Sequence, residues 1–546
     1  MKKVFMIFIV VSLVFIILTD FSSNNEEVTR DLNHDSNVNS NDVSEGEIKL
    51  NAMIIKHPIT MSSKNMLWLQ KAEERAGVEI HWEEVTADWD EKKNAMLAGG
   101  DIPHLIVGPN AITDDDFAQF TGLFQDLNEL IDHAPNVQKM FEDKPEIEII
   151  ATQQDGEIYG LPKYQRYSPK SATMQFINKD WLDNLGLNMP TTWNELHQVL
   201  LAFKNEDANG NGDPDDEIPF DWAPVGTSGF GFFHPTVLLG STGITPSESG
   251  TGYFAEDGEL KNFFMDERYK DVVIFLNKLW KDDLINQEVF TQEFTSYQSM
   301  ARGDGRIAKV GYTFGWEIPD RFGNQLASQY KSFPPMKISE DSTNEVRWAY
   351  DYNVLNYGEN MIQMSAQTEE KEAAMRFINE LYDPETSMQV LFGSIGESID
   401  DHGDGTYSVL PPANESIDPG TWKWTKTWAE NGPMYLADSL ELELGADMQT
   451  RNSQQEAYQD AYSRIDIQRD VYPGIFIKYS QEDNTEMSLR NKDLMNLAMA
   501  KFAEWITEGT IEDEWDWYID QLITIGLPEN LELMQHYFDD YLRSVE

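Results

Sequence analysis

A run of oxygen-bearing side chains between residues 207 and 217 has the spacing of a calcium-binding loop. Oxygen side chains stand at loop positions 1, 3, 5 and 9, and these residues are Asp207, Asn209, Asn211 and Asp215. Gly212, at position 6, permits a sharp turn, and Asp213, at position 7, can offer its backbone carbonyl. Such alternation suits a hard cation that takes about six to eight oxygens. The alternative is an acidic, glycine-rich surface turn, but this alternation favours calcium.

The sequence at the end of the loop does not decide which carboxylate is the last calcium ligand. An EF-hand loop requires a bidentate Glu at position 12, where this chain has Ile218. The closing carboxylates are therefore Asp215 together with Asp216 or Glu217. The predicted ligand set lists Asp207, Asn209, Asn211, Asp213, Asp215 and Asp216, with Glu217 as the alternative to Asp216.

A helix must hold the start of this loop. Thr192 with Glu195 three residues later forms a capping box, and apolar residues recur at helical spacing from Trp193 to Phe203. The helix ends near Lys204 and the loop follows at once. An ion bound there would fix where the chain leaves the helix, which is a structural role and not a catalytic one.

Composition excludes several classes of function. The 546 residues include 41 Lys+Arg and 95 Asp+Glu, so the formal net charge is 41 − 95 = −54. This charge argues against binding nucleic acid or an anionic membrane through the bulk surface. The absence of cysteine excludes disulfides, thiolate metal sites and cysteine nucleophiles.

The N-terminal residues predict export. Lys2 and Lys3 precede an apolar run over 4–18, which has the length of a signal-peptide core, so residues 1–21 are a signal segment. Phe21 stands where a bacterial lipoprotein carries its lipidated cysteine. The protein is therefore released, or tethered by the uncleaved segment, or altered here relative to its relatives. Residues 22–47 are polar and predict a flexible stalk.

The globular pattern begins at residue 48. Strands are predicted at 48–55, 78–85 and 105–107, with helices at 66–76 and 89–97 between them. This β-α-β-α-β order predicts a parallel sheet in an α/β lobe. Further helices are predicted at 271–280 and 369–381, and the last hundred residues read as mostly helical.

Several ordered motifs resemble one family. The stretch 176–220, including the acidic loop, is similar to the extracellular solute-binding proteins of carbohydrate ABC importers, and above all to the large lipoprotein branch that includes alginate- and pectin-oligosaccharide binders. Supporting segments are Ala95–Pro103, Asp155–Pro162, Phe392–Glu397 and Gly509–Tyr518. The resemblance implies a two-lobed α/β fold, periplasmic-binding-protein-like (type II), with hinge-linked lobes and extra C-terminal helices.

The same resemblance implies a division of the chain. Lobe 1 would contain 48–165 and 346–400, lobe 2 with the calcium loop would contain 166–345, and 401–546 would be a mostly helical part that packs on both lobes. Calcium would then be a structural cofactor within lobe 2.

A cleft for a sugar needs aromatic platforms and hydrogen-bonding groups. The candidate substrate residues are Tyr164, Arg166, Trp222, Trp316, Trp348, Tyr350 and Tyr352, the last three alternating along a predicted strand. For any single aromatic residue, core packing is the commoner fate. Arg166, Arg302 and Arg347 could pair with uronate carboxylates, or with acidic residues of the protein itself.

Motifs for catalysis were absent. The chain lacks Gly-x-Ser-x-Gly, His-Glu-x-x-His and the P-loop pattern. The prediction is a monomeric, non-enzymatic substrate-binding component of an ABC importer. It would capture an oligosaccharide, uronate-containing ones included, at the outer face of the membrane and deliver it to permease subunits. The alternatives are a secreted glycan hydrolase or lyase with a structural calcium, and a sensor subunit with no role in transport.

Overall fold

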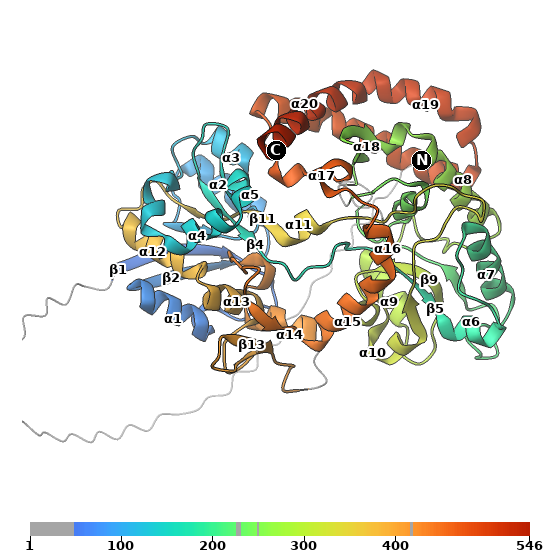
Figure 1. Ribbon diagram of the computed structural model, residues 1–546, viewed down its shortest axis with the longest axis horizontal. Coiled ribbons are helices and arrows are strands. Elements are labelled where there is room, and N and C mark those ends of the chain that lie inside the picture. Colours follow the sequence, from blue (N-terminus) through green and yellow to red (C-terminus); the bar gives the residue numbers. More distant parts are fainter. Residues whose placement is uncertain (1–47, 225–230, 248–249, 415–418, 546) are drawn as a thin grey trace, which may run out of the picture. The chain divides into compact units, whose positions relative to one another are not determined.

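Two β-sheets of different strand order organise the chain, and each has its own helices (Figure 1). The computed structural model describes residues 48–224, 231–247, 250–414 and 419–545. The predicted signal segment and stalk lie outside the described residues. The chain from Glu47 to Glu546 forms one compact unit. We call the first sheet with its helices lobe 1 and the second sheet with its helices lobe 2.

The sheet of lobe 1 has the strand order β2-β1-β3-β11-β4. Its strands are β1 (Ile48–Ile55), β2 (Val78–Val85), β3 (Leu105–Val107), β4 (Gly160–Tyr164) and β11 (Tyr357–Met364). β1 is parallel to β2 and β3, whereas β11 is antiparallel to β3 and β4. The three strands predicted first are confirmed with their bounds, and α1 (Leu67–Ala76) and α2 (Trp89–Gly99) lie between them in sequence.

Helices pack on both faces of this sheet. Leu105 and Val107 belong to one core and Ile106, between them, to another, because successive side chains of a strand point to opposite faces. The smaller core includes residues of α2 and α3. The other helices of the lobe contribute to the larger core. Besides α1 and α2, the helices of lobe 1 are α3 (Asp114–Gln119), α4 (Pro135–Asp143), α5 (Pro145–Ala151), α12 (Lys371–Leu381) and α13 (Pro384–Phe392).

The sheet of lobe 2 has the order β10-β5-β9-β6. Its strands are β5 (Met174–Asn178), β6 (Ile218–Phe220), β9 (Val310–Gly315) and β10 (Tyr330–Ser332). The helices are α6 (Lys179–Leu185), α7 (Trp193–Asn205), α8 (Glu267–Lys281), α9 (Phe294–Arg302) and α10 (Ile318–Leu326). The capping box of α7 is confirmed, since Thr192 and Glu195 exchange both hydrogen bonds.

The chain crosses between the lobes more than once. It leaves β4 of lobe 1 for β5 of lobe 2 and returns from β10 to β11, passing through α11 (Tyr352–Asn356). A third connection follows later, because Met448 lies in the core of lobe 1 and Tyr458 in that of lobe 2. The elements before this crossing, on the lobe 1 side, are β12 (Ile399–Asp401), β13 (Thr406–Val409), α14 (Pro419–Lys426) and β14 (Glu441–Glu443). The crossing itself runs through α15 (Ala446–Gln455), and α16 (Gln459–Tyr462) and α17 (Ile467–Asp470) follow it.

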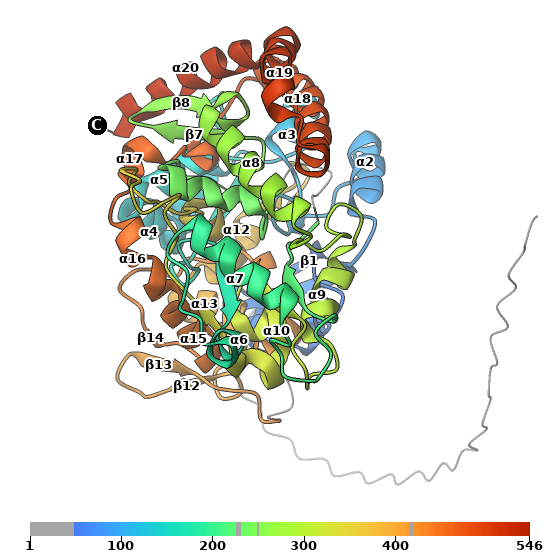
Figure 2. The same cartoon turned by 90° about the vertical axis from the view of Figure 1, so that its right-hand side faces the viewer.

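The last three helices extend the core of lobe 2. They are α18 (Gln481–Glu508), α19 (Ile511–Ile525) and α20 (Leu527–Val545). Phe502, Trp505 and Tyr518 are buried in the same core as the second sheet. Figure 2 shows these helices beside α8 and the hairpin of β7 (Tyr253–Glu256) and β8 (Glu259–Asn262). Among the described residues, none of the helices combines the length and apolar character needed to cross a membrane.

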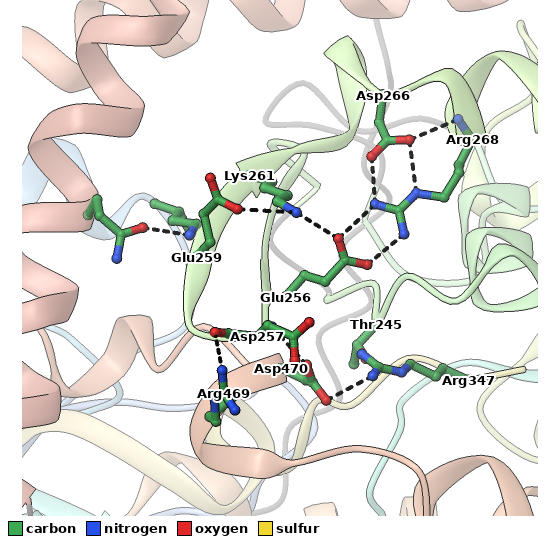
Figure 3. A network of polar contacts seen from close by, with 12 residues as sticks. Thr245, Glu256, Asp257, Glu259, Lys261, Asp266, Arg268, Arg347, Arg469 and Asp470 are labelled. Carbon is green, nitrogen blue, oxygen red and sulfur yellow. Dashed lines mark hydrogen bonds and ion pairs between the residues drawn. The ribbon is translucent and has the colours of Figure 1, made fainter. Parts of the chain in front are cut away.

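Ion pairs fasten the hairpin to its neighbours (Figure 3). Glu256 of β7 accepts hydrogen bonds from Arg268 of α8 and from Lys261 of β8. At the hairpin turn, the backbone oxygen of Asp257 accepts from Arg469 of α17, at 2.7 Å. Asp470, next to it, forms an ion pair with Arg347 at 3.0 Å. Hairpin, helix and interlobe connection are therefore joined in one polar network.

Candidate ligand-binding cleft

A cavity of about 820 Å³ lies between the two lobes. Lobe 1 contributes β4 and the segment around α14, lobe 2 contributes the end of β9 and the start of α10, and α15 closes one side. Figure 1 shows α14, α15 and α10 following one another along one side of this unit. The volume lies within the range of about 300–1,000 Å³ that is usual for small-molecule sites.

Two half-buried tryptophans, one from each lobe, line the cavity. Trp316 follows Gly315 at the end of β9, and Trp424 lies on α14. The ring of Trp424 lies 5.4 Å from that of His57, and its backbone oxygen accepts a hydrogen bond from Thr60 at 2.7 Å. Indole rings offer apolar faces of the kind that stack on the apolar face of a sugar ring.

Glu430 stands at the centre of the polar groups of lobe 1. Its carboxylate lies 3.2 Å from the ammonium of Lys163 and 3.4 Å from that of Lys423. Gln165 donates to the same carboxylate at 2.9 Å. Burial acts to raise the pKa of Glu430, but the two lysines outweigh it, so the pKa lies below its ordinary value. The carboxylate is therefore held ionised.

Arg451 of α15 is a buried cation beside the tryptophan of lobe 2. Its guanidinium lies 5.2 Å from the ring centroid of Trp316 and donates to the backbone oxygen of Tyr167 at 2.8 Å. Its Nε has no hydrogen-bond partner. Burial lowers the pKa of Arg451, against the attraction of nearby carboxylates that include Glu317 and Asp447. The side chain thus presents donor capacity next to an aromatic platform.

A buried ion pair fixes the helix that follows Trp316. Arg321 of α10 and Asp221, just after β6, are both fully buried and lie 2.8 Å apart. Asn286 and Gln292 also donate to Asp221, each at 3.0 Å. Because breaking a buried pair leaves an uncompensated charge, this contact holds α10 firmly on the sheet of lobe 2. It thereby fixes the turn that carries Trp316.

Comparison with known proteins gives the family. The family described as bacterial extracellular solute-binding protein matches residues 68–397, which is more than half of the chain. The chain belongs to this family.

Named relatives are similar over nearly the whole chain. The fructooligosaccharide ABC transporter substrate-binding protein FusA of Streptococcus pneumoniae is 28% identical over 508 residues, 90% of each chain. Its structure with kestose has a TM-score of 0.77 and covers 91% of this chain and 100% of that one. An HMO-binding, ABC-transporter-associated solute-binding protein of Bifidobacterium longum infantis is 32% identical, with a TM-score of 0.84, over 91% of this chain and 100% of that one.

The structure places one predicted substrate residue, Trp316, in the cavity and moves several others into cores. Trp222, Trp348 and Tyr350 are buried in the core of lobe 2. Tyr164 is buried in the core of lobe 1. These four assignments are corrected, because rings enclosed on all sides by core residues offer no face to a ligand.

Tyr352 and Arg166 also lie outside the cavity lining. Tyr352 is half-buried and packs against the cores of both lobes, and its hydroxyl contacts that of Tyr164 at 3.2 Å. The predicted strand over 348–352 is wrong, because 345–351 are irregular and Tyr352 begins α11. Arg166 lines a separate surface groove with Tyr407 and Asp438, and donates to the backbone oxygen of Leu440.

Sequence reasoning missed the residues next to those it selected. Lys163 and Gln165 line the cavity, whereas Tyr164 and Arg166 point away from it. Alternate side chains along an extended segment face opposite sides, so a choice that is one residue out selects the wrong face. Trp424, Glu430 and Arg451 were also missed, and only the local density of tryptophans gave a signal for the first.

The other two predicted uronate partners are already engaged. Arg302 lines the cavity but donates to the backbone oxygen of Asp320 at 3.0 Å and pairs with its carboxylate at 3.3 Å. Arg347 pairs with Asp470 in the network of Figure 3, away from the cavity lining. Both therefore act as partners of acidic residues of the protein.

The predicted calcium loop joins α7 to β6. Oδ1 of Asp207 and Oε2 of Glu217 are buried without hydrogen-bond partners. Burial raises the pKa of Glu217, with the nearby Asp216 adding to the effect. Among the described residues, no three Asp, Glu or His side chains form a metal-binding group. The remaining ligands of an ion would therefore be amide or carbonyl oxygens, which the loop supplies.

The other side chains of the loop bond within it. Asn209 and Asn211 accept from the backbone N–H groups of Asn211 and Asp213, at 2.9 and 2.7 Å. Asp216 accepts from the side-chain amides of both asparagines, at 2.8 to 3.1 Å. Asp213 and Asp215 are exposed. The two buried, unpartnered oxygens fit a bound cation and favour Glu217 over Asp216 as the closing carboxylate.

Proposed function

We propose that this protein is the oligosaccharide-binding component of an ABC importer, which captures its ligand in the interlobe cleft and delivers it to permease subunits. The observation that carries the proposal is the pair of tryptophans, one from each lobe, facing a cavity of about 820 Å³. A ligand that contacts both lobes favours the closed state through contacts that exist only in that state. FusA and the HMO-binding relative, named for oligosaccharides, support the ligand class.

Glu430 does not suit the role of general acid in glycoside hydrolysis. A glycoside hydrolase requires a carboxylic acid whose pKa is raised so that it can protonate the leaving group. Glu430 lies beside two lysines that hold its pKa below the ordinary value, which is the opposite of the shift that such an acid requires. This argues against the alternative of a secreted glycan hydrolase that uses Glu430 as its acid.

The test is to titrate the purified protein with kestose and a panel of plant and animal oligosaccharides. Binding is measured by calorimetry and by the melting temperature of the protein. At a ligand concentration of about 100 Kd, a single bound ligand stabilises the folded state by about 2.7 kcal/mol. We expect a rise in Tm with at least one ligand, and no new product by chromatography. Turnover of a glycan, or no binding anywhere in the panel, would contradict the proposal.

We also propose a structural calcium ion in the loop, held by Asp207, Glu217 and the oxygens of Asn209 and Asn211. The unpartnered carboxylate oxygens support it, as does the existence of an EF-hand mutant of FusA. When bound, such an ion neutralises buried negative charge; it takes no part in ligand chemistry.

Chelation tests this site. Removal of calcium is expected to lower the Tm, because Asp207 and Glu217 then lack a cation. Glu217→Gln should lower both the calcium stoichiometry and the Tm, whereas Glu206→Gln, at an exposed position just before the loop, serves as the control. Elemental analysis and melting with and without chelator measure both effects. If Asp216→Asn abolishes calcium binding and Glu217→Gln does not, the assignment of the closing ligand is wrong.

A further inference from the structure

The charges that line the cleft cancel. Four basic and four acidic side chains face the cavity, so their formal sum is 4 − 4 = 0. Arg302 pairs with Asp320, and Arg451 lies within the influence of Glu317 and Asp447. The two cations on the lobe 2 side, Arg302 and Arg451, therefore share the cavity lining with three carboxylates of the protein, and the cleft as a whole has no net positive charge to attract an anionic ligand.

The lobe 1 side would be an anion site without Glu430. Lys163 and Lys423 extend into the same cavity, and the only carboxylate paired with either among the described residues is Glu430, at 3.2 and 3.4 Å. Lys163 also donates to the backbone oxygen of Glu430 at 2.6 Å. The carboxylate of Glu430 therefore occupies the position next to the two ammonium groups that the carboxylate of a uronate would need.

We propose that the cleft selects uncharged oligosaccharides and that Glu430 is the residue that excludes uronates. This inference rests on the proposed function of oligosaccharide binding. A uronate carboxylate would have to approach Glu430 or displace it, and like charges at close range repel strongly in a partly desolvated cleft. A sugar hydroxyl, in contrast, can donate to Glu430 in a charge-assisted hydrogen bond.

The charge of the whole chain acts in the same direction. With a formal net charge of −54, the protein repels an anionic ligand during approach. This long-range effect is screened by salt, whereas the short-range effect at Glu430 is largely not. The two can therefore be separated: salt should speed uronate association without making the equilibrium affinity of a uronate equal to that of a neutral sugar.

Matched ligand pairs test the selectivity of the wild-type protein. Each pair consists of oligosaccharides of equal length and linkage, one built of hexoses and the other of the corresponding uronic acids, as in galactose against galacturonic acid. Kestose is included as a neutral reference. We expect every pair with measurable binding to favour the neutral member by about 100-fold or more in Kd. A preference for the uronate, or equal affinity, overturns the inference and leaves the proposed function standing.

The same titrations distinguish a failure of oligosaccharide binding from a failure of the selection against uronates. If neither kestose nor any member of any pair binds, oligosaccharide binding itself is wrong. If only neutral members bind, and still do so with unchanged affinity at high salt, both stand.

The variant Glu430→Gln tests the residue. It frees two lysines while keeping the shape of the side chain, so the affinity for the uronate member should rise by about tenfold or more, which is about 1.4 kcal/mol. The matched control is Glu504→Gln, which makes the same change of charge beside Lys501 on α18, outside the cleft lining. A gain equal to that of the control would mean that only overall charge matters and would overturn the role of Glu430.

Asp447→Asn tests whether cleft charge in general, and not Glu430 in particular, sets the selectivity. It makes the same change of charge inside the cleft without removing the partner of either lysine. Neutralising any cleft carboxylate should relax the exclusion of uronates, so a smaller gain in uronate affinity is expected. A gain as large as that of Glu430→Gln would show that any cleft carboxylate excludes uronates and would overturn the specific role of Glu430.

Discussion

At the scale of single residues, the cleft depends on two side chains that approach the same space from different lobes. Trp316 comes from the end of β9 and Trp424 from α14, about a hundred positions later in the chain. Each is only half-buried, although most large aromatic residues of this chain lie in cores. Two half-exposed indole rings gathered around one cavity are typical of a ligand-binding groove.

Replacing either tryptophan by alanine is expected to weaken oligosaccharide binding by about 10- to 100-fold, because each ring supplies stacking area that water cannot replace. Trp316→Ala and Trp424→Ala should be compared by calorimetry with wild type. The control is Trp517→Ala on α19, whose side chain is 48% exposed and lies outside the cleft lining. If only one of the two cleft variants loses affinity, the ligand contacts one lobe and the clamp between lobes is wrong.

At the scale of elements, polar networks attach α10 and the β7–β8 hairpin to the rest of lobe 2. The pair Asp221–Arg321 fixes α10, and the network of Figure 3 fixes the β7–β8 hairpin against α8 and α17. In that network Glu256 accepts hydrogen bonds from two cations. Burial acts to raise the pKa of Glu256, but Arg268 and Lys261 lower it to about 2. The carboxylate therefore favours the folded state only when it is ionised.

The lowered pKa of Glu256 makes the free energy of unfolding depend on pH in a known direction. Because the pKa of Glu256 is lower in the folded than in the unfolded protein, its contribution is complete above about pH 4.5 and is lost as the pH falls toward about 2. With partial exposure taken into account, Glu256→Gln should lower the free energy of unfolding by about 1–2 kcal/mol at neutral pH.

The difference between Glu256→Gln and wild type should shrink as the pH falls below about 4, which urea unfolding at several pH values measures. Glu259→Gln is the control, since that side chain is 72% exposed and pairs only with Lys261 at 3.3 Å. A difference that stays constant with pH would show that the variant acts through packing and not through charge.

At the scale of the whole unit, one lysine joins the last helices to lobe 1. Lys478, just before α18, lies 2.8 Å from Asp114 of α3 and 2.9 Å from Glu359 of β11. α18 itself belongs to the core of lobe 2. Burial acts to lower the pKa of Lys478, but the two carboxylates raise it above its ordinary value. The ion pairs thus act as a contact between the lobes that does not involve the cleft.

Lys478→Met is expected to shift the unliganded protein toward more open arrangements, because it removes the cation shared by two lobe 1 carboxylates. Small-angle scattering should show a larger radius of gyration without ligand, and oligosaccharide affinity should fall about two- to tenfold as closure becomes less favourable. Lys501→Met is the control, since its ion pairs lie within the C-terminal helices. Scattering identical to wild type would show that this contact does not bias closure.

Local sequence patterns were sufficient to predict many of the helices and strands and to identify the protein family. The first strands, the capped helix α7 and the βαβ order of lobe 1 are short-range features, set by alternation, capping and turn residues that a sequence displays directly. Motif order likewise identified a solute-binding protein, which the family match confirms. The calcium loop belongs to the same class of local signal and stays a prediction.

Which side chains line the cleft was decided by the tertiary structure. Which face of the segment 163–166 meets the ligand depends on how β4 sits in its sheet, and a shift of one residue exchanges Tyr164 for Gln165. Trp222 and Trp348 look like Trp316 in sequence, yet the cores of a large protein enclose them. Cleft residues come from segments hundreds of positions apart, such as His57 and Arg451. Their convergence is a product of long-range packing, and no local pattern encodes it.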